Sequence, residues 1–145
     1  MREINYTEVY RLRECLKQLA EHHNEVSRNF RGCFPKKPLE DTLAAFEKAL
    51  NSCKSRIAVI EEGERISGFC KIDINGEDGS IDYLIVLKEC RGCGCGRELM
   101  DWAVGALKAS GVKRIEIRVV DGNDAVGFYE KYGFKTVSHI LRNDL

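Results

Sequence analysis

The stretch from Val86 to Arg97, VLKECRGCGCGR, constrains the fold of this chain more than any other. An apolar run over 81–87, rich in β-branched and aromatic residues, precedes the turn and predicts a strand. Residues 98–108 follow with apolar side chains at helical spacing. A strand therefore leads into a helix through a glycine-rich turn. Glycine leaves backbone N–H groups accessible, and the first amides of a helix have no intrahelical partner, so this turn is suited to binding phosphate.

The spacing of the glycines disfavours two common nucleotide-binding motifs. The turn does not read Gly-x-Gly-x-x-Gly with an acidic residue about twenty positions later, so a dinucleotide-binding fold is disfavoured. No Gly-Lys-Ser/Thr closes the turn either, which excludes a P-loop. Taken alone, the turn leaves open a tight strand-to-helix connection without any ligand.

Two motifs together resemble the signatures of the GNAT family of N-acetyltransferases. The first is Arg91-x-x-Gly94-x-Gly96, which begins five residues after Val86 on the predicted strand. The second is the segment 123–134, NDAVGFYEKYGF, which looks like the other cofactor motif of that family. Both motifs occur in the family's order and at its usual separation. The resemblance extends from about residue 56 to the end, and more loosely over the whole chain.

Length and composition are those of a single ordinary globular domain, residues 1–145. The 23 basic residues equal the 23 acidic residues, so no global field directs the protein to nucleic acid or to a membrane surface. No apolar stretch is long enough to span a bilayer. The N-terminus lacks the apolar core of a signal peptide, so we expect a cytoplasmic protein without membrane or nucleic-acid partners.

The seven cysteines predict reduced thiols and no disulfide framework, because no export signal accompanies them. Cys90-x-x-Cys93-x-Cys95 invites comparison with a metal site, but zinc needs four ligands and the remaining cysteines and histidines are scattered. We therefore expect no metal and interpret these cysteines as small residues in a tight turn. A second interpretation is that Cys93 or Cys95, near a helix N-terminus, is an oxidation-sensitive thiol.

The remaining periodicity predicts a mixed, mainly antiparallel central sheet with helices on both faces, an α+β fold (α/β, three layers) of the GNAT type. Thr7 is expected to cap the first helix, and 21–37 is expected to be a polar connection that carries His22 and His23. The expected strands are 4–6, 56–61, 66–75, 80–87, 114–120 and 134–141. The expected helices are 7–20, one from Pro38 to about residue 50, 96–110 and 123–132.

The family resemblance implies acetyl-CoA as the acetyl donor. The amides of the turn are expected to surround the pyrophosphate, and strand backbone is expected to hold the pantetheine arm. Asn123 matches a family residue that contacts the arm, and it can equally be a helix N-cap. The cofactor-binding residues implied in this way are Leu84, Ile85, Val86, Arg91, Gly92, Cys93, Gly94, Cys95, Gly96, Arg97 and Asn123.

Three side chains are the candidates for proton transfer. Tyr129 matches the tyrosine that protonates the coenzyme A thiolate in many relatives, and its alternative role is packing of a helix on the sheet. The position of the family's usual glutamate base holds Arg118. Asp82 and then Glu116 are the remaining candidates for the base, and a reaction without a dedicated base stays open.

The expected function is acetyl transfer to a primary amine of a small molecule by direct attack in a ternary complex. Arg118 in place of the glutamate favours an acceptor that carries a carboxylate, such as an amino acid. The alternatives are acetylation of a protein or peptide and a non-catalytic acyl-CoA sensor. Nucleic-acid binding through the basic stretch 28–37 has no matching fold. A homodimer is a further expectation.

Overall fold

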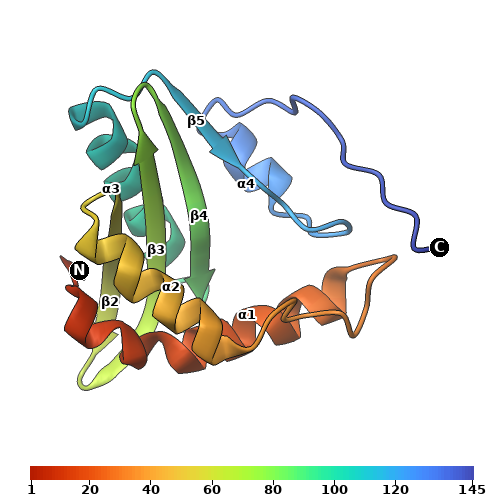
Figure 1. The fold of residues 1–145 in the computed structure, drawn as a ribbon, viewed down its shortest axis with the longest axis horizontal. Coiled ribbons are helices and arrows are strands. Elements are labelled where there is room, and N and C mark those ends of the chain that lie inside the picture. The colour runs from red at the N-terminus through yellow and green to blue at the C-terminus, as the bar shows by residue number, and fades with distance from the viewer.

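A five-stranded sheet forms the centre of the protein (Figure 1). The computed structural model describes all residues from 1 to 145. Strands from β1 to β4 pair antiparallel with their neighbours, and β5 pairs parallel with β4. In sheet order, the strands are β1 (Arg2–Glu3), β2 (Ser55–Glu62), β3 (Arg65–Asn75), β4 (Asp78–Val86) and β5 (Arg114–Ile117). The predicted mixed, mainly antiparallel sheet is confirmed.

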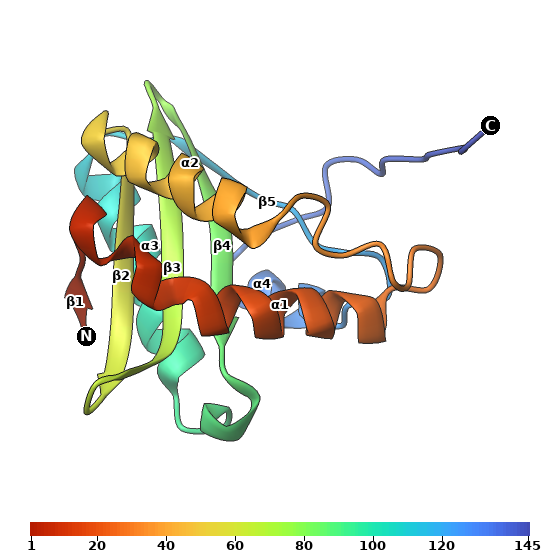
Figure 2. The ribbon, with the colours of Figure 1, turned by 60° about the horizontal axis from the view of Figure 1, so that its bottom comes forward.

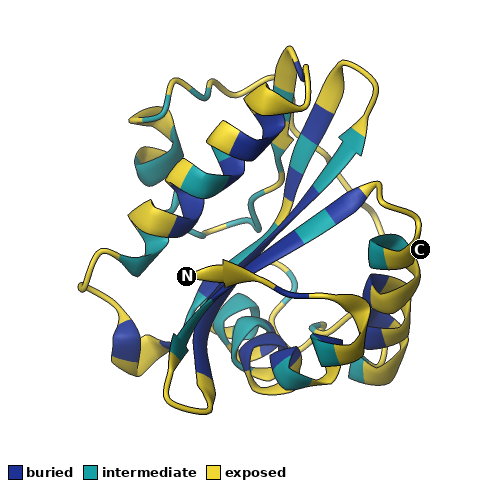
Figure 3. Cartoon of the chain, turned by 90° about the vertical axis from the view of Figure 1, so that its left-hand side faces the viewer, coloured by how far each residue is buried: buried dark blue, intermediate teal, exposed yellow.

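Helices cover both faces of this sheet (Figures 1 and 2). On one face, Phe46 and Phe69 belong to the core beneath the first two helices; on the other, Leu99 and Leu107 belong to the core beneath the last two. Buried residues lie on the inward sides of the helices and along the central strands (Figure 3). The helices are α1 (Arg13–Val26), α2 (Leu39–Asn51), α3 (Cys95–Ala109) and α4 (Val126–Glu130). The predicted three-layer arrangement is confirmed.

The N-terminal segment differs from its prediction in three respects. The first strand lies at Arg2–Glu3, and a 3₁₀ helix, η1 (Tyr6–Leu12), precedes α1. Asn5, not Thr7, is the cap: its Oδ1 accepts a hydrogen bond from the backbone N–H of Thr7 at 2.9 Å. Glu8 completes a capping box with Asn5. The prediction of Thr7 as the cap was wrong because the side chain two positions earlier already occupies that role.

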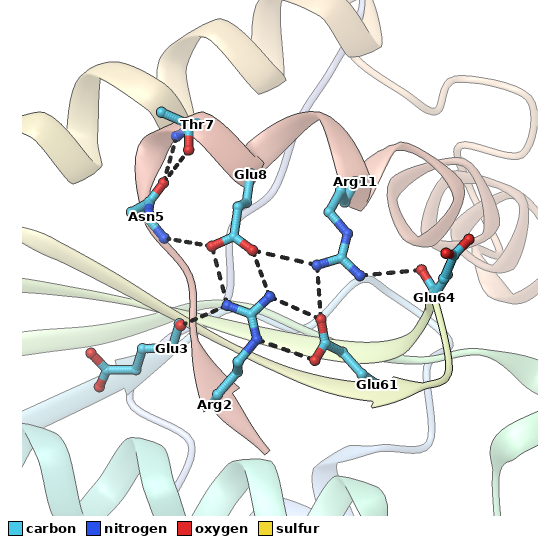
Figure 4. A network of polar contacts seen from close by, with 8 residues as sticks. All are labelled: Arg2, Glu3, Asn5, Thr7, Glu8, Arg11, Glu61 and Glu64. Atoms are coloured by element: carbon cyan, nitrogen blue, oxygen red, sulfur yellow. Dashed lines mark hydrogen bonds and ion pairs between the residues drawn. The ribbon is translucent and has the colours of Figure 1, made fainter.

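Ion pairs hold this N-terminal helix against the end of β2 (Figure 4). Arg2 bridges Glu8 at 2.5 Å and Glu61 at 3.0 Å, and Arg11 pairs with Glu61 at 2.8 Å. The hydrogen bond from Arg2 lowers the pKa of Glu8 to about 2. Because these side chains remain partly exposed, the network orients the helix more than it stabilises the fold.

The C-terminal third corrects two further predictions. Strand β5 ends at Ile117 and not at Val120, because its pairing with β4 covers four residue pairs only. The segment 134–141 is not a strand: it forms no ladder and extends away from the sheet, with its side chains exposed from Lys135 onward (Figure 2). Its alternating apolar residues have the composition of a strand, but no neighbouring strand lies against them.

Candidate active site

The candidate site is an opening between β4 and β5. Their parallel pairing stops at Ile81 opposite Ile117, whereas β4 continues to Val86. Figure 1 shows the two strands side by side at one end and separating toward the other. The backbone of β4 from Asp82 onward therefore has no strand partner on the side of β5. At its end, the carbonyl oxygen of Val86 accepts a hydrogen bond from a side chain instead.

A bulge in β4 coincides with the start of this opening. In the pairing with β3, Tyr83 lies opposite Lys71 and Ile81 lies opposite Ile72, so Asp82 has no partner. Asp82 is also the first residue beyond the pairing with β5. It is thus the one residue of β4 without a partner on either neighbouring strand. A bulge of this kind bends the strand and re-aims its side chains, here toward the opening.

Strand β4 leads into the N-terminus of α3 through the glycine-rich turn. Gly92 and Gly94 both adopt φ of 84°, the left-handed region that residues with a Cβ avoid. Gly94 occupies the N-cap position of α3, and no side chain caps the helix. The first amides of α3 are consequently left without side-chain partners, and the positive end of the helix dipole lies beside them. These are the features of an anion site at a helix N-terminus.

A hydrogen bond and the close approach of Gly96 to its neighbours place the turn relative to its surroundings. Arg91 Nε donates a hydrogen bond to the carbonyl oxygen of Val86 at 3.0 Å, which ties the turn to the end of β4. A Cβ placed on Gly96 would lie 4.0 Å from the ring of Phe128 and from the side chain of Val86. The beginning of α3 therefore lies next to both β4 and α4.

Tyr129 lies on α4, in the core between this helix and α3. Its ring packs against Phe128 at 5.5 Å and Phe134 at 6.2 Å between centroids. Burial raises the pKa of the Tyr129 phenol above its usual value. A phenol is protonated at neutral pH at its usual pKa of about 10, so Tyr129 carries a proton that it can donate. Packing and proton donation, the two roles that the sequence left open, are compatible here.

Asn123 precedes α4 and does not cap it. Its Oδ1 accepts a hydrogen bond from the backbone N–H of Ala125 at 3.0 Å, and its own N–H donates to Val120 O at 3.1 Å. The helix begins only at Val126, without a side-chain cap. The N-cap interpretation was wrong because Asn123 closes the turn between β5 and α4 instead.

The two candidate bases lie on the same face of the sheet. Glu116 is paired with Ser80, one position before the opening begins, and Arg118 follows the last paired residue of β5. Asp82 faces this opening from β4, and its Oδ2 forms an ion pair with Lys71 Nζ at 2.7 Å. Lys71 was not among the predicted site residues, although a lysine inside the apolar run of β3 was a signal that the sequence offered.

The far wall of the opening comes from the end of α1. His22 and His23 are in α1, not in a loop as predicted, because the helix continues to Val26. Burial lowers the pKa of both imidazoles, and the His23 ring contacts Phe34 edge-on at 5.1 Å. Partly buried histidines at this position remain neutral over a wider pH range than exposed ones.

Hydrogen bonds join the segment at the end of α1 to the turn that follows β5. The carboxylate of Asp121 accepts hydrogen bonds from Ser27 Oγ at 2.7 Å and from the backbone N–H of Arg28 at 2.8 Å. The Ser27 hydrogen bond is the main reason why the pKa of Asp121 is lowered. Gly122 adopts φ of 77°, and a Cβ there would lie 2.2 Å from Val26 O. Glycine is therefore required where the two segments meet.

All of the predicted site residues except Cys93 line one open groove. The groove runs from the helix N-terminus of α3, along the free edge of β4, to the end of α1. Cys93 is exposed in the turn outside it. None of the helices combines the length and the apolar composition that crossing a bilayer requires.

The sequence model of the Acetyltransferase (GNAT) family matches residues 19–134. The chain belongs to this family. The predicted family is thereby confirmed, and the chain is an acetyltransferase by membership. The GNAT fold is also that of the solved structures it resembles.

Three solved structures illustrate this similarity. The tetramutant of the BH1408 protein from Bacillus halodurans is 25% identical, covers 99% of this chain and 98% of its own, and has a TM-score of 0.78. A protein from Clostridium acetobutylicum described as a predicted acetyltransferase, solved with acetyl-CoA, is 19% identical, with coverages of 99% and 94% and a TM-score of 0.77. AAC(6')-Iy, in complex with a bisubstrate analogue, is 16% identical, with coverages of 99% and 95% and a TM-score of 0.75.

Proposed function

We propose that this GNAT protein transfers the acetyl group of acetyl-CoA to a primary amine of a small molecule, by direct attack in a ternary complex. The observation that carries the proposal is the continuity of two binding elements. The free edge of β4 runs from Asp82 to Val86 and leads directly to the uncapped N-terminus of α3. A peptide-like arm that ends in a diphosphate fits these two elements in sequence.

The donor is held mainly by backbone groups. Amides of 92–97 would surround the diphosphate, with the guanidinium groups of Arg91 and Arg97 nearby. The pantetheine arm would add to the edge of β4 at Leu84, Ile85 and Val86, as a strand adds to a sheet. Asn123 stands on the opposite side of the groove. The acetyl-CoA complex of the Clostridium acetobutylicum relative, which shares this fold, supports the choice of donor.

In this reaction the protein would position the two substrates and donate one proton to the departing thiolate. The amine nitrogen attacks the thioester carbonyl carbon, the C–S bond breaks, and the sulfur leaves with a proton. A backbone N–H on the free edge of β4 would stabilise the negative charge that develops on the carbonyl oxygen. Tyr129, whose phenol is protonated at neutral pH, would donate the proton to the departing thiolate. Asp82 or Glu116 would take the proton that the amine loses.

The acceptor end carries charges of both signs. Asp82 borders the opening on β4, and Arg118 follows the last paired residue on β5. An acceptor with an ammonium group and a carboxylate would match this pair, so we favour an amino acid or a related small amine. AAC(6')-Iy was solved with a bisubstrate analogue that joins CoA to acetylneamine. That complex supports a small-molecule acceptor over a protein or peptide.

The test is release of free thiol from acetyl-CoA in the presence of a panel of amines. We expect turnover with amino acids, and weaker turnover with amines of the same length that lack a carboxylate. Calorimetry with acetyl-CoA alone separates binding from catalysis. Equal turnover of both amine groups contradicts the acceptor class, binding without turnover favours an acyl-CoA sensor, and no binding contradicts the proposal as a whole.

We also propose a homodimer in a cytoplasmic setting. The segment 134–141 exposes apolar side chains, among them Val137 at 87% and Leu141 at 94%, and contact with a second copy would bury them. The free state of all seven cysteines agrees with a reducing compartment. Light scattering on the full chain and on a chain that ends at residue 133 tests the dimer. A monomeric full chain contradicts it.

A further inference from the structure

Lys71 is a buried lysine next to the candidate site. It lies in β3, and its side chain is 5% exposed. Its Nζ donates to Asp73 Oδ1 at 2.6 Å and to Asp82 Oδ2 at 2.7 Å. A buried ammonium is costly unless it is paired and hydrogen-bonded, so the position of Lys71 depends on these two carboxylates.

Aromatic residues fix the ammonium from the side of α2. The Nζ atom of Lys71 lies 5.3 Å from the centroid of the Phe46 ring, within the range of a cation–π contact. Phe46 packs against Tyr83 at 4.9 Å, and Tyr83 is the residue opposite Lys71 in the sheet. The lysine is thus held by packing on one side and by ion pairs on the other. Its side chain has little freedom to move.

The two carboxylates play different roles. Asp73 pairs through Oδ1 with Lys71 and also with Ser55 Oγ, in the regular part of the sheet. Asp82 is the bulge residue at the start of the opening, and its side chain is 41% exposed. Lys71 holds its Oδ2, while its Oδ1 has no hydrogen-bond partner in the structure. One oxygen of Asp82 is therefore anchored and the other is available in the groove.

We propose that Lys71 is a positioning residue for acetyl transfer: it holds Asp82 so that the free oxygen binds the ammonium group of the acceptor. One positive charge and two negative charges leave the cluster of Lys71, Asp73 and Asp82 with one net negative charge, which a cationic acceptor neutralises. This inference rests on the proposed function. It assigns the amine-binding role to Asp82, while Glu116, which contacts no cation in the structure, lies outside the cluster.

The role predicts selectivity for cationic amines. A carboxylate that is fixed at one oxygen binds an ammonium group in one orientation. After that group has lost its proton to Asp82 or Glu116, the neutral amine nitrogen is already aligned for attack on the thioester carbon. A neutral nucleophile, such as an aromatic amine at pH 7, gains nothing from this charge. The ratio of kcat/KM for an aliphatic amine to kcat/KM for an aromatic amine therefore reports on the cluster, whereas general damage to the fold lowers both values.

The experiment measures this ratio in three variants. Asp82→Asn removes the charge at a partly exposed position, and Lys71→Met removes the anchor while keeping an unbranched apolar side chain. We expect each to lower the selectivity ratio about tenfold through a higher KM for the aliphatic amine. Lys113→Met is the matched control, because Lys113 forms an exposed pair with Glu77 at 2.7 Å away from the groove. We expect the control to leave the ratio unchanged.

The double variant Lys71→Met/Asp82→Asn completes a mutant cycle. If Lys71 acts through Asp82, the loss of the lysine adds nothing once the carboxylate is absent. Additive losses, or a wild-type ratio in Asp82→Asn, overturn the inference. The Asp82→Asn result decides the matter even if Lys71→Met does not fold. Absence of turnover in the wild-type protein contradicts the proposed function itself, so the two failures are distinguishable.

Discussion

The two halves of the groove are built from different kinds of groups. The donor half, formed by the edge of β4 and the turn 91–97, presents mainly backbone amides. The acceptor half, formed by Asp82, Glu116, Arg118 and the end of α1, presents charged and aromatic side chains. Backbone amides bind the same donor whatever side chains surround them, whereas side chains determine which acceptor fits. One half can therefore serve a whole family while the other is particular to this protein.

The Tyr129 variant is expected to have the largest effect, because Tyr129 is the side chain to which we assign proton transfer to the departing donor thiolate. We expect Tyr129→Phe to lower kcat about 100-fold, since the thiolate loses its proton donor. Affinity for acetyl-CoA should change little, because in the proposed complex the phenol lies near the sulfur and away from the diphosphate. Steady-state kinetics and calorimetry measure the two effects. Undiminished kcat would contradict the assignment of Tyr129 as the proton donor.

A variant of Gly122 tests whether the acceptor half also depends on close backbone packing, here between the turn after β5 and the end of α1. We expect Gly122→Ala to destabilise the protein by about 2 kcal/mol, because the new Cβ meets Val26 O and the residue must keep positive φ. Gly111→Ala is the control: its φ is 82° but no atom lies within 4 Å of the added Cβ, so it isolates the cost of the dihedral. Urea denaturation should show the larger loss for Gly122→Ala. Equal losses would mean that the segments around Gly122 and Val26 move apart to accommodate the added methyl group at little cost.

Gly94 tests the backbone character of the donor half directly. We expect Gly94→Ala to weaken acetyl-CoA binding about tenfold, because positive φ costs an alanine on the order of 1 kcal/mol and the turn shifts to relieve it. Gly105→Ala, inside α3 with open space around the added Cβ, is the matched control and should leave binding unchanged. Calorimetry compares the variants. Unchanged affinity in Gly94→Ala would show that the turn geometry is not needed.

His22 and His23 give the smallest expected effect, and it concerns the acceptor half. Burial lowers the pKa of both, so the folded state binds protons less readily than the unfolded state. Their contribution to stability is complete above the usual histidine value of about 6.5 and is lost as the pH falls through the lowered values. We expect His23→Gln to flatten the acid side of a stability–pH curve. An unchanged slope would show that the imidazole is effectively solvated.

Much of the fold was readable because it is encoded locally. Helical spacing in 98–108, the glycines of the turn and the alternation of the central strands each depend on neighbours in sequence. The two cofactor motifs indicated the family to which the chain belongs. The errors occur where distant segments decide the outcome: 134–141 has the pattern of a strand but lacks a partner, and α1 extends over His22 and His23 because its end packs against the turn after β5.

The sequence by itself determined the glycine-rich turn between β4 and α3, because glycine permits the positive φ that Gly92 and Gly94 adopt there. Only the tertiary structure decided how β4 and β5 separate, and which side chains meet there. Lys71 and Asp82 are eleven residues apart and meet because a bulge shifts the register between two strands. Contacts across a sheet depend on register and on what covers each face, and neither is written in the local pattern of residues.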